Sequence, residues 1–412
     1  MTSRDRSIQN SNNQIPPFLS ARGNKNKAII SNGENFTLGT ENGSKFWNVL
    51  QYGVIGDGVT DDTTAIQAVI DGASGGSDSG GSIRGGDTVY FPPGTYLVDS
   101  ITMKPGVTIL GDGSKTSVMV ARSNSTKIFT YTAASTQTYF NILNIGFYSD
   151  SKTSCYGIYL DGTDSGKRLS YVRINDVNVY GTFTSGIYLK YCANTFIRDA
   201  FMTNCTTGIY LNVCADTNIE NCMVQLGSGN GYHILGGAGA FDEGVRLVGC
   251  STNGQSRGLY IDGQDWGLVS GCSFTTCSNG GMSTANTCSF WKFTACDFAT
   301  GVSPNYGINL TSGTTGFSFI GCTIGADTFG AIIRGTKHTF IGNFLTNNSN
   351  IDVYIDGGTN NTINSNVANS TGSGFSIYEV SPANYNIING NLVNGTITVV
   401  GANSVSANNV TY

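Results

Sequence analysis

The chain repeats a short strand-like phrase, and this repeat limits its fold more than any other feature. The phrase is a glycine, an aliphatic residue, a tyrosine and a second aliphatic residue, and its first copies begin at Gly157, Gly186 and Gly208. Varied copies begin at Gly231 and Gly258, and degraded copies continue toward the C-terminus. Self-similarity at a regular interval is typical of solenoids and other repeat architectures. The sequence therefore predicts one long repeat array rather than several globular domains.

A second phrase follows each copy and contains a column of small residues. Alignment of this phrase gives the members Ile145, Val177, Ala200, Cys222, Cys250, Cys272, Cys296, Cys322, Asn343, Asn366 and Asn391. From 145 to 391 the ten steps cover 246 residues, so the mean coil has 24.6 residues. Each coil has room for two or three short strands and contains no helix-length amphipathic segment. This pattern predicts an all-β fold, a right-handed single-stranded parallel β-helix.

The column accounts for five of the eleven cysteines. Cysteine is a small and readily buried residue, so an inward-facing stack of cysteines fills a core. We expect the other six to be structural thiols as well, and the absence of an apolar leader favours reduced thiols over disulfides. The chain has no CxxC spacing and only two histidines, His233 and His338. We therefore predict no metal site and no cofactor.

Charge and hydropathy narrow the classes of partner. Charged residues make up 12% of the chain and the net charge is −5, with no basic stretch that would attract nucleic acid. No run of residues approaches the length of an apolar membrane-spanning helix. The sequence therefore predicts neither nucleic-acid binding nor membrane insertion.

The segment before the repeats predicts a cap. Asp61 or Asp62 can begin a helix whose apolar residues Ile66, Val69 and Ile70 lie on one face. Such a helix would cover the open N-terminal end of a solenoid, where edge strands have unpaired backbone groups.

Four segments follow from these features. We expect an N-terminal arm over residues 1–45, a cap region over 46–115, the parallel β-helix over 116–395 and a C-terminal end over 396–412.

Several motifs of the cap region carry a family resemblance. Gly56–Gly58, Thr60–Thr63, Phe91–Tyr96 and Gly111–Gly113 resemble the opening of the pectate-lyase-superfamily β-helices, which include bacteriophage tailspikes and capsule depolymerases. The motifs cover about residues 46–113, and the later coils agree in architecture. The resemblance implies a homotrimer in the virion tail, an N-terminal segment that docks to a phage tail or adaptor protein, and polysaccharide binding along the rod.

The leading functional prediction is a phage tailspike that attaches to a host surface polysaccharide, an O-antigen or a capsule, with or without cleaving it. One alternative is a non-catalytic polysaccharide-binding adhesin, and another is a monomeric bacterial polysaccharide lyase or hydrolase. The catalytic signatures of polygalacturonases and pectate lyases are missing from the sequence, so pectin chemistry is unsupported.

Cleavage by hydrolysis would require two carboxyl groups about 5–5.5 or 6.5–9.5 Å apart. Asp242 and Glu243 lie in an insertion, Asp262 and Asp265 bracket a loop on the next coil, and Glu220 precedes them by one coil. Neighbouring coils are about 4.8 Å apart, so we predict that a pair from this set could line a cleft with Glu220 near its floor. Asp199 and Asp216 belong to the same set of acids that could cluster on the coil faces. In the alternative interpretation each Asp of the set is a turn residue that bonds its own backbone.

The repeated strand phrase also predicts a stripe on one outer face. The stripe, which we call the tyrosine stripe, comprises Tyr159, Tyr188, Tyr210, His233 and Tyr260. We favour a subunit interface, because aromatic residues are enriched there. In the alternative, Tyr210, His233 and Tyr260 bind a glycan together with Trp266, which can stack on a sugar face.

Overall fold

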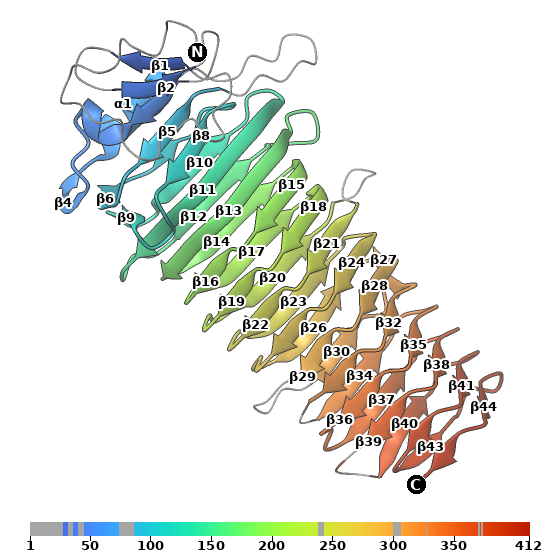
Figure 1. Ribbon diagram of the computed structural model, residues 1–412. Helices are drawn as coiled ribbons and strands as arrows, with labels where there is room; N and C mark the ends of the chain where they lie inside the picture. The colour runs from blue at the N-terminus through green and yellow to red at the C-terminus, as the bar shows by residue number, and fades with distance from the viewer. Residues whose placement is uncertain are drawn as a thin grey trace, which may run out of the picture.

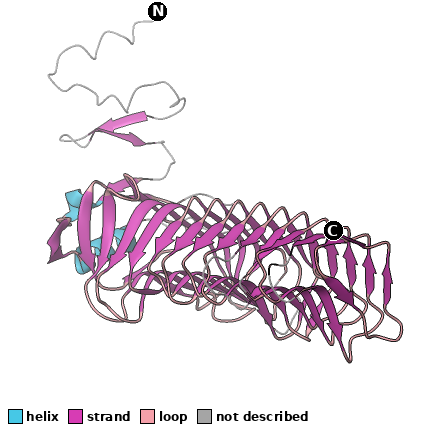
Figure 2. Ribbon diagram, turned by 90° about the horizontal axis from the view of Figure 1, so that it is seen from below, coloured by secondary structure: helices cyan, strands magenta, loops and turns pink. Residues whose placement is uncertain are grey.

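The computed structural model shows a rod of stacked coils (Figure 1). It describes residues 28–31, 36–39, 45–73, 86–237, 243–299, 306–326, 328–369, 371 and 374–412. Strands are stacked along the whole rod, and the helical segments of the described ranges lie at its N-terminal end (Figure 2). Nearly every strand pairs in parallel with a strand of the next coil. The predicted all-β parallel β-helix with a short N-terminal capping helix is therefore confirmed.

The coils form three parallel sheets, and all but the first and last coil contribute to each of them. Sheet 1 has thirteen strands: β7 (Ile101–Thr102), β10 (Lys127–Thr132), β12 (Cys155–Asp161), β14 (Phe183–Lys190), β17 (Thr207–Asn212), β20 (Asn230–Leu235), β23 (Arg257–Asp262), β26 (Gly280–Ala285), β30 (Tyr306–Leu310), β34 (Phe329–Ile333), β37 (Ile351–Asp356), β40 (Phe375–Val380) and β43 (Thr396–Thr398).

Sheets 2 and 3 share the long strands β11 (Gln137–Ser149) and β13 (Leu169–Gly181), which bend from one sheet into the other. Sheet 2 also contains β3 (Phe46–Asn48), β5 (Thr88–Phe91), β8 (Thr108–Gly111), β15 (Cys192–Arg198), β18 (Ala215–Glu220), β21 (Val245–Val248), β24 (Gly267–Ser270), β28 (Trp291–Thr294), β32 (Ser318–Ile320), β35 (Thr339–Ile341), β38 (Thr362–Asn364), β41 (Ile387–Asn389) and β44 (Val405–Ala407).

Sheet 3 completes the coils. It also contains β4 (Asp57–Asp61), β6 (Gly94–Val98), β9 (Ser117–Ala121), β16 (Phe201–Thr203), β19 (Met223–Gln225), β22 (Ser251–Asn253), β25 (Ser273–Thr275), β29 (Asp297–Ala299), β33 (Thr323–Gly325), β36 (Phe344–Thr346), β39 (Val367–Asn369), β42 (Leu392–Val393) and β45 (Val410–Thr411). Two small pairs remain, β1 (Ala28–Ser31) with β2 (Phe36–Gly39), and β27 (Cys288–Ser289) with β31 (Thr314–Thr315).

The small-residue column lies at the bend between sheets 2 and 3 and is buried throughout. A single residue with a left-handed backbone precedes each of its members from Val177 to Cys296, for example Asp199 (φ 51°) and Asn221 (φ 54°). Gly, Asn and Asp tolerate this conformation better than other residues, which explains why they recur at the bend. Asp199 is therefore a turn residue here, as the alternative interpretation of the acids expected.

All eleven cysteines are buried and unpaired, so the prediction of reduced core thiols is confirmed. Toward the C-terminus the column becomes a ladder of amides. The Nδ2 of Asn343 donates to the Oδ1 of Asn366, and that of Asn366 donates to the Oδ1 of Asn391, at 2.9 and 3.0 Å. The ladder continues to Asn409, and β44 and β45 carry the sheets beyond residue 395.

The helix α1 (Thr63–Gly72) covers the N-terminal end of the core, as predicted. Its buried residues Ile66, Val69 and Ile70 belong to the same apolar cluster as the coils. The carboxylate of Asp61 accepts a bond from the backbone N–H of Thr63 at 3.0 Å, at the start of the helix. No helix in the described ranges is long and apolar enough to cross a membrane.

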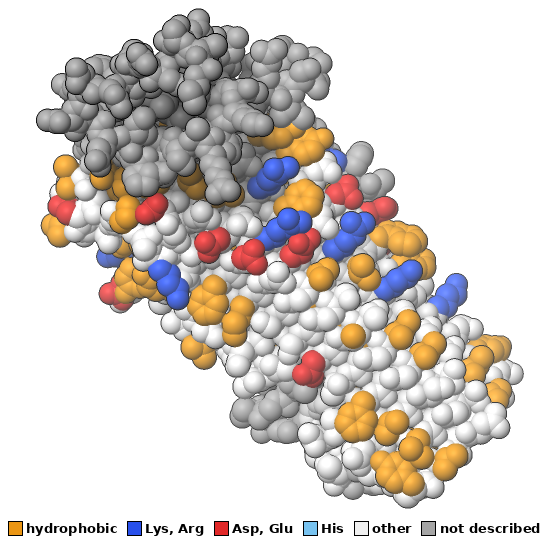
Figure 3. Space-filling view, viewed as in Figure 1, with side chains coloured by type: hydrophobic (Ala, Val, Ile, Leu, Met, Phe, Trp, Pro, Cys, Tyr) orange, Lys and Arg blue, Asp and Glu red, His pale blue; other side chains and the backbone are white. Residues whose placement is uncertain are grey.

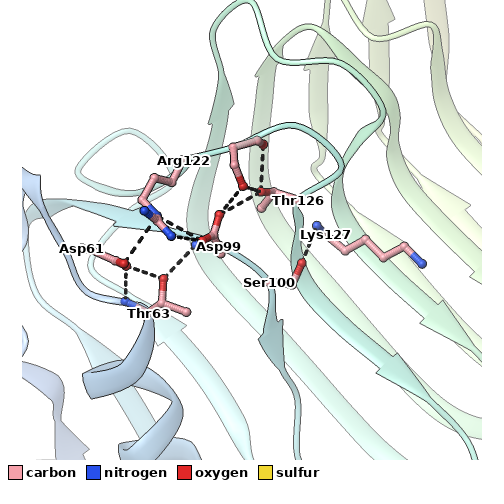
Figure 4. A network of polar contacts seen from close by, with 8 residues as sticks. Asp61, Thr63, Asp99, Ser100, Arg122, Thr126 and Lys127 are labelled. Carbon is pink, nitrogen blue, oxygen red and sulfur yellow. Dashed lines mark hydrogen bonds and ion pairs between the residues drawn. The ribbon is translucent and has the colours of Figure 1, made fainter.

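An exposed polar network joins this cap to the first coils (Figure 4). The guanidinium of Arg122 contacts Asp61, at 3.4 Å, and also Asp99. The Oγ of Thr63 accepts a bond from the backbone N–H of Asp99 at 2.8 Å. Hydrogen bonds from Thr63 lower the pKa of Asp61, and bonds from Ser123 and Arg122 lower that of Asp99 although burial opposes this. The network therefore holds the helix on the rod, and we assign it a structural role.

Candidate functional site

The tyrosine stripe lies on the outer face of sheet 1, as predicted. The strand register aligns its five members on consecutive coils. The rings of Tyr159 and Tyr188 stack at 4.6 Å, and those of Tyr210 and His233 stack at 4.3 Å, each pair within 6° of parallel. Tyr188 meets Tyr210 edge to face at 5.2 Å. The stripe is thus a continuous, half-buried aromatic surface along four inter-coil steps, about 19 Å.

Charged groups border the stripe at both ends and along one side. The ammonium of Lys127 lies 3.5 Å from the ring centre of Tyr159, and the guanidinium of Arg257 lies 5.1 Å from that of Tyr260. Beside the stripe Asp161 pairs with Lys190 at 3.3 Å. Cations above aromatic faces are attracted by the electron density of the ring. The face is therefore amphipathic, with apolar rings between polar groups.

His233 is the fourth of the five members of the stripe and is neutral at pH 7. Burial lowers its pKa to about 4, although the nearby carboxylate of Asp262 opposes the shift. Its Nε2 is buried and has no hydrogen-bond partner among the described residues. Burial also raises the pKa of Tyr188 and Tyr210, so their hydroxyl groups stay protonated. The site therefore offers neutral hydrogen-bonding groups that are partly removed from water.

The predicted acids do not form one cluster. Asp262 ends β23 beside the stripe, where its carboxylate accepts a bond from Asn286 at 2.5 Å. Asp161 and Asp262 occupy equivalent positions four coils apart, about 19 Å, which exceeds the spacing that glycosidases use. Glu220 lies at the far end of sheet 2, paired with Arg198 at 2.9 Å. Glu220 pairs in register with Val248 on the next coil. Val248 lies five residues after Glu243, so Glu220 and Glu243 are about 16 Å apart along the strand direction. The structure thus does not bring Glu220 together with the loop acids.

Two of the loop acids do lie on neighbouring coils. The backbone N–H of Gly244 donates to the carbonyl of Trp266 at 2.8 Å, which places Glu243 next to Asp265. Glu243 is exposed, whereas the Oδ1 of Asp265 is buried without a hydrogen-bond partner among the described residues. Asp242 lies outside the described residues.

Trp266 does not belong to the tyrosine stripe. It lies in the turn from sheet 1 to sheet 2, where its ring stacks on that of Phe290 at 4.5 Å. Both residues have a left-handed backbone, with φ of 53° and 59°. Phe290 was missed in the sequence because the repeat phrases stop short of this turn.

Within the described ranges, no group of three or more His, Cys, Asp or Glu residues is arranged to hold a metal ion.

A family model matches most of the rod. The model described as rhamnogalacturonase A/epimerase, pectate lyase-like, matches residues 46–327. The chain belongs to this family. The rest of the molecule continues the same coils, so the pectate-lyase-like architecture extends from β3 to β45.

Solved structures share this fold at low sequence identity. The A-module of the mannuronan C-5 epimerase AlgE6 of Azotobacter vinelandii is 18% identical, with a TM-score of 0.62, over 89% of this chain and 99% of that one. The tailspike protein of E. coli bacteriophage HK620 is 12% identical, with a TM-score of 0.57, over 95% of this chain and 84% of that one. These likenesses establish the β-helix fold.

Sequence relatives match only short segments. The non-secreted LysM effector LysM15 of Penicillium expansum is 60% identical over 60 residues, which are 14% of this chain and 4% of the effector. The mannuronan C5-epimerase AlgE1 of A. vinelandii is 43% identical over 75 residues, which are 16% of this chain and 5% of the epimerase.

Proposed function

We propose that this protein binds a polysaccharide along the tyrosine stripe and serves as a bacteriophage tailspike in host attachment. The observation that carries the proposal is the unbroken aromatic surface of sheet 1, whose rings contact one another from Tyr159 to Tyr260 and are bordered by Lys127 and Arg257. Sugar rings have apolar faces and polar edges, so a face that alternates rings with hydrogen-bonding groups suits them. The long axis of the stripe suits a polymer.

The charged border favours a glycan site over a subunit interface. Interface cores are depleted of charged residues, whereas Asp161, Lys190 and Asp262 lie directly beside the rings.

More specifically, we propose that the protein is a homotrimeric tailspike in the virion tail and that its N-terminal segment docks to a phage tail or adaptor protein. It is supported by the resemblance of the cap motifs and by the shared fold of phage tailspikes, among them tailspike protein 3 of bacteriophage CBA120 at a TM-score of 0.57. The structural neighbour from phage HK620 is described in complex with a pentasaccharide. Light scattering of the full chain tests the trimer.

We expect Tyr210→Ala to weaken binding of purified host polysaccharide about tenfold, because it removes one stacked ring from the middle of the stripe. Calorimetry or a glycan array with the full chain measures this loss. The matched control is Tyr180→Ala, which removes a tyrosine on another face whose ring lies 4.7 Å from that of Tyr148, tilted by 34°. Loss of the trimer with unchanged glycan binding would instead identify the stripe as the subunit interface.

A second candidate function is cleavage of the bound polysaccharide. It is favoured by Glu243 and Asp265, which lie at equivalent positions on neighbouring coils whose backbones are about 4.8 Å apart. Retaining glycosidases use two carboxyl groups about 5–5.5 Å apart. Incubation with purified host polysaccharide tests it, with chain length measured by size-exclusion chromatography. Falling chain length that is lost in Asp265→Asn but kept in Glu220→Gln would assign hydrolysis to this pair. If the chain length stays constant with the wild type, the protein is an adhesin that binds the polysaccharide without cleaving it.

A further inference from the structure

A second face of the rod carries cations without partners. The outward side chains of one position in sheet 2 form a single file on consecutive coils: Asn141, Arg173, Phe196, Asn218, Arg246, Leu268 and Lys292. Basic side chains follow a line along one face of the molecule, with hydrophobic side chains beside them (Figure 3). Among the described residues, Arg173, Arg246 and Lys292 form no ion pair. We call this file the basic row.

Aromatic residues lie two positions before the basic row, where the chain enters sheet 2: Tyr139 and Tyr171 lie near the starts of β11 and β13, and Trp266 and Phe290 lie in the turns before β24 and β28. Tyr139 stacks on Tyr171 at 5.0 Å and 3°, beside Arg173, just as Trp266 stacks on Phe290 beside Lys292. The exposed fractions of Tyr171, Trp266 and Phe290 are 41%, 49% and 43%. Because these rings are so exposed, the hydrophobic effect contributes little to the stability of the fold at these positions.

These four aromatic residues also have an unfavourable backbone conformation. Their φ angles lie between 53° and 64°, a region that bulky residues rarely adopt and that stores strain. At the same turn position other coils have Asn194, Asp216 or Gly244, which tolerate it. The rod requires a left-handed residue at this position but not a bulky one, and backbone strain of this kind clusters at binding sites.

The aromatic pairs and cations form two clusters on one face of the rod. At the first, a pocket of about 280 Å³ lies between Arg173 and Arg198, with Phe196 and Asn175 in its lining. At the second, Arg246 and Lys292 lie beside the Trp266 pair. From Tyr171 to Trp266 there are four inter-coil steps, about 19 Å.

We propose that this face is a second binding site, separate from the tyrosine stripe, for a linear anionic polysaccharide. Its sugar rings stack on the two aromatic pairs, and its carboxylate or sulfate groups contact Arg173, Arg246 and Lys292. The intervening Asn218 can bond hydroxyl groups.

The width of the positive strip selects a single chain over a larger polyanion. Asp176 and Asp199 lie at the bend next to sheet 3, and Glu220 lies two residues from Asn218 on the same side. Asp216, Glu243 and Asp265 lie in the turns on the other side of the row. From Arg173 to Asp176 there are three residues, about 10 Å. A nucleic acid duplex or an anionic membrane would place negative charge over these acids, whereas a single glycan chain can follow the row alone.

The test uses the full chain and polygalacturonate oligomers as the anionic probe, with neutral galactan oligomers of equal length beside it. We expect the anionic probe to bind and to weaken as the salt concentration rises, because exposed charges are screened. The double variant Arg246→Gln and Lys292→Gln should lose about tenfold in affinity. Trp266→Asn should lose a similar factor without backbone strain, since asparagine adopts the left-handed conformation more easily.

Arg334→Gln is the matched control, because it removes a cation that is paired with Asp356 on sheet 1. Unchanged melting temperatures confirm that the variants are folded. Equal binding of both probes, equal loss in the control, tighter binding of duplex DNA or no binding at all would each overturn the proposal. Tyr210→Ala should leave this affinity unchanged, which separates it from the function proposed for the stripe.

Discussion

Replacing Asn366 by alanine is expected to lower the free energy of unfolding by about 3–5 kcal/mol. The side chain is buried in the middle of the amide ladder. Its Oδ1 accepts bonds from the backbone N–H and the Nδ2 of Asn343, both at 2.9 Å. Its Nδ2 donates to the carbonyl of Phe340 and to the Oδ1 of Asn391, both at 3.0 Å. Alanine would leave these groups buried without partners, and each loss costs the desolvation of a polar group.

Asn364→Ala is the matched control for this experiment. Asn364 lies two residues earlier, and its Oδ1 accepts a bond from the exposed hydroxyl of Ser365. We therefore expect its replacement to change the free energy of unfolding by less than about 1 kcal/mol. Urea unfolding measures both variants. Hydrogen exchange should localise the loss of protection to the C-terminal coils, because each coil of a solenoid contacts only its neighbours. Equal stability of the two variants would show that the ladder contributes nothing to the rod.

The fold was predictable because one pattern recurs on every coil. A buried column admits only side chains that fill its place in the core, here aliphatic, cysteine or amide side chains, so the series from Ile145 to Asn391 is visible in the sequence, and its spacing gives the coil length. The tyrosine stripe was predictable for the same reason, since alternate residues of a strand face opposite sides.

The grouping of the candidate acids was less predictable, because turns decide it. Glu220 ends a sheet 2 strand, whereas Glu243 and Asp265 precede one, and the sequence does not show how far a turn carries the chain around the rod. The exposed aromatic turn residues did leave a signal. Each lies six residues before a member of the small-residue column, as Trp266 does before Cys272, and alignment of that position would have revealed them.

Replacing Glu379 by glutamine is expected to cost about 3–5 kcal/mol at pH 7. The residue is fully buried near the C-terminal end of the rod. Its carboxylate accepts bonds from the Nδ2 of Asn386 at 2.6 Å and the Oγ of Ser404 at 2.7 Å. It also accepts the backbone N–H groups of Val400 and Gly401, both at 3.0 Å. The amide of glutamine offers one acceptor atom in place of two, and its NH₂ group would face donors.

The dependence of this effect on pH has a definite sign. Burial opposes ionisation of Glu379, but the bonds from Asn386, Ser404 and the two backbone groups outweigh it and lower its pKa. A carboxylate whose pKa is lower in the folded state stabilises the fold above its unfolded pKa, about 4.3, and loses this contribution as the pH falls through the folded value. The difference in stability between wild type and Glu379→Gln should therefore be constant from pH 7 to about pH 5 and shrink below it. Thermal unfolding from pH 7 to 3 measures this difference. The control is Glu220→Gln, which removes a partly exposed acid paired with Arg198. We expect the control to change stability by less than about 1 kcal/mol. A difference that grew in acid would show that Glu379 is held protonated and that the terminal coils are stabilised without its charge.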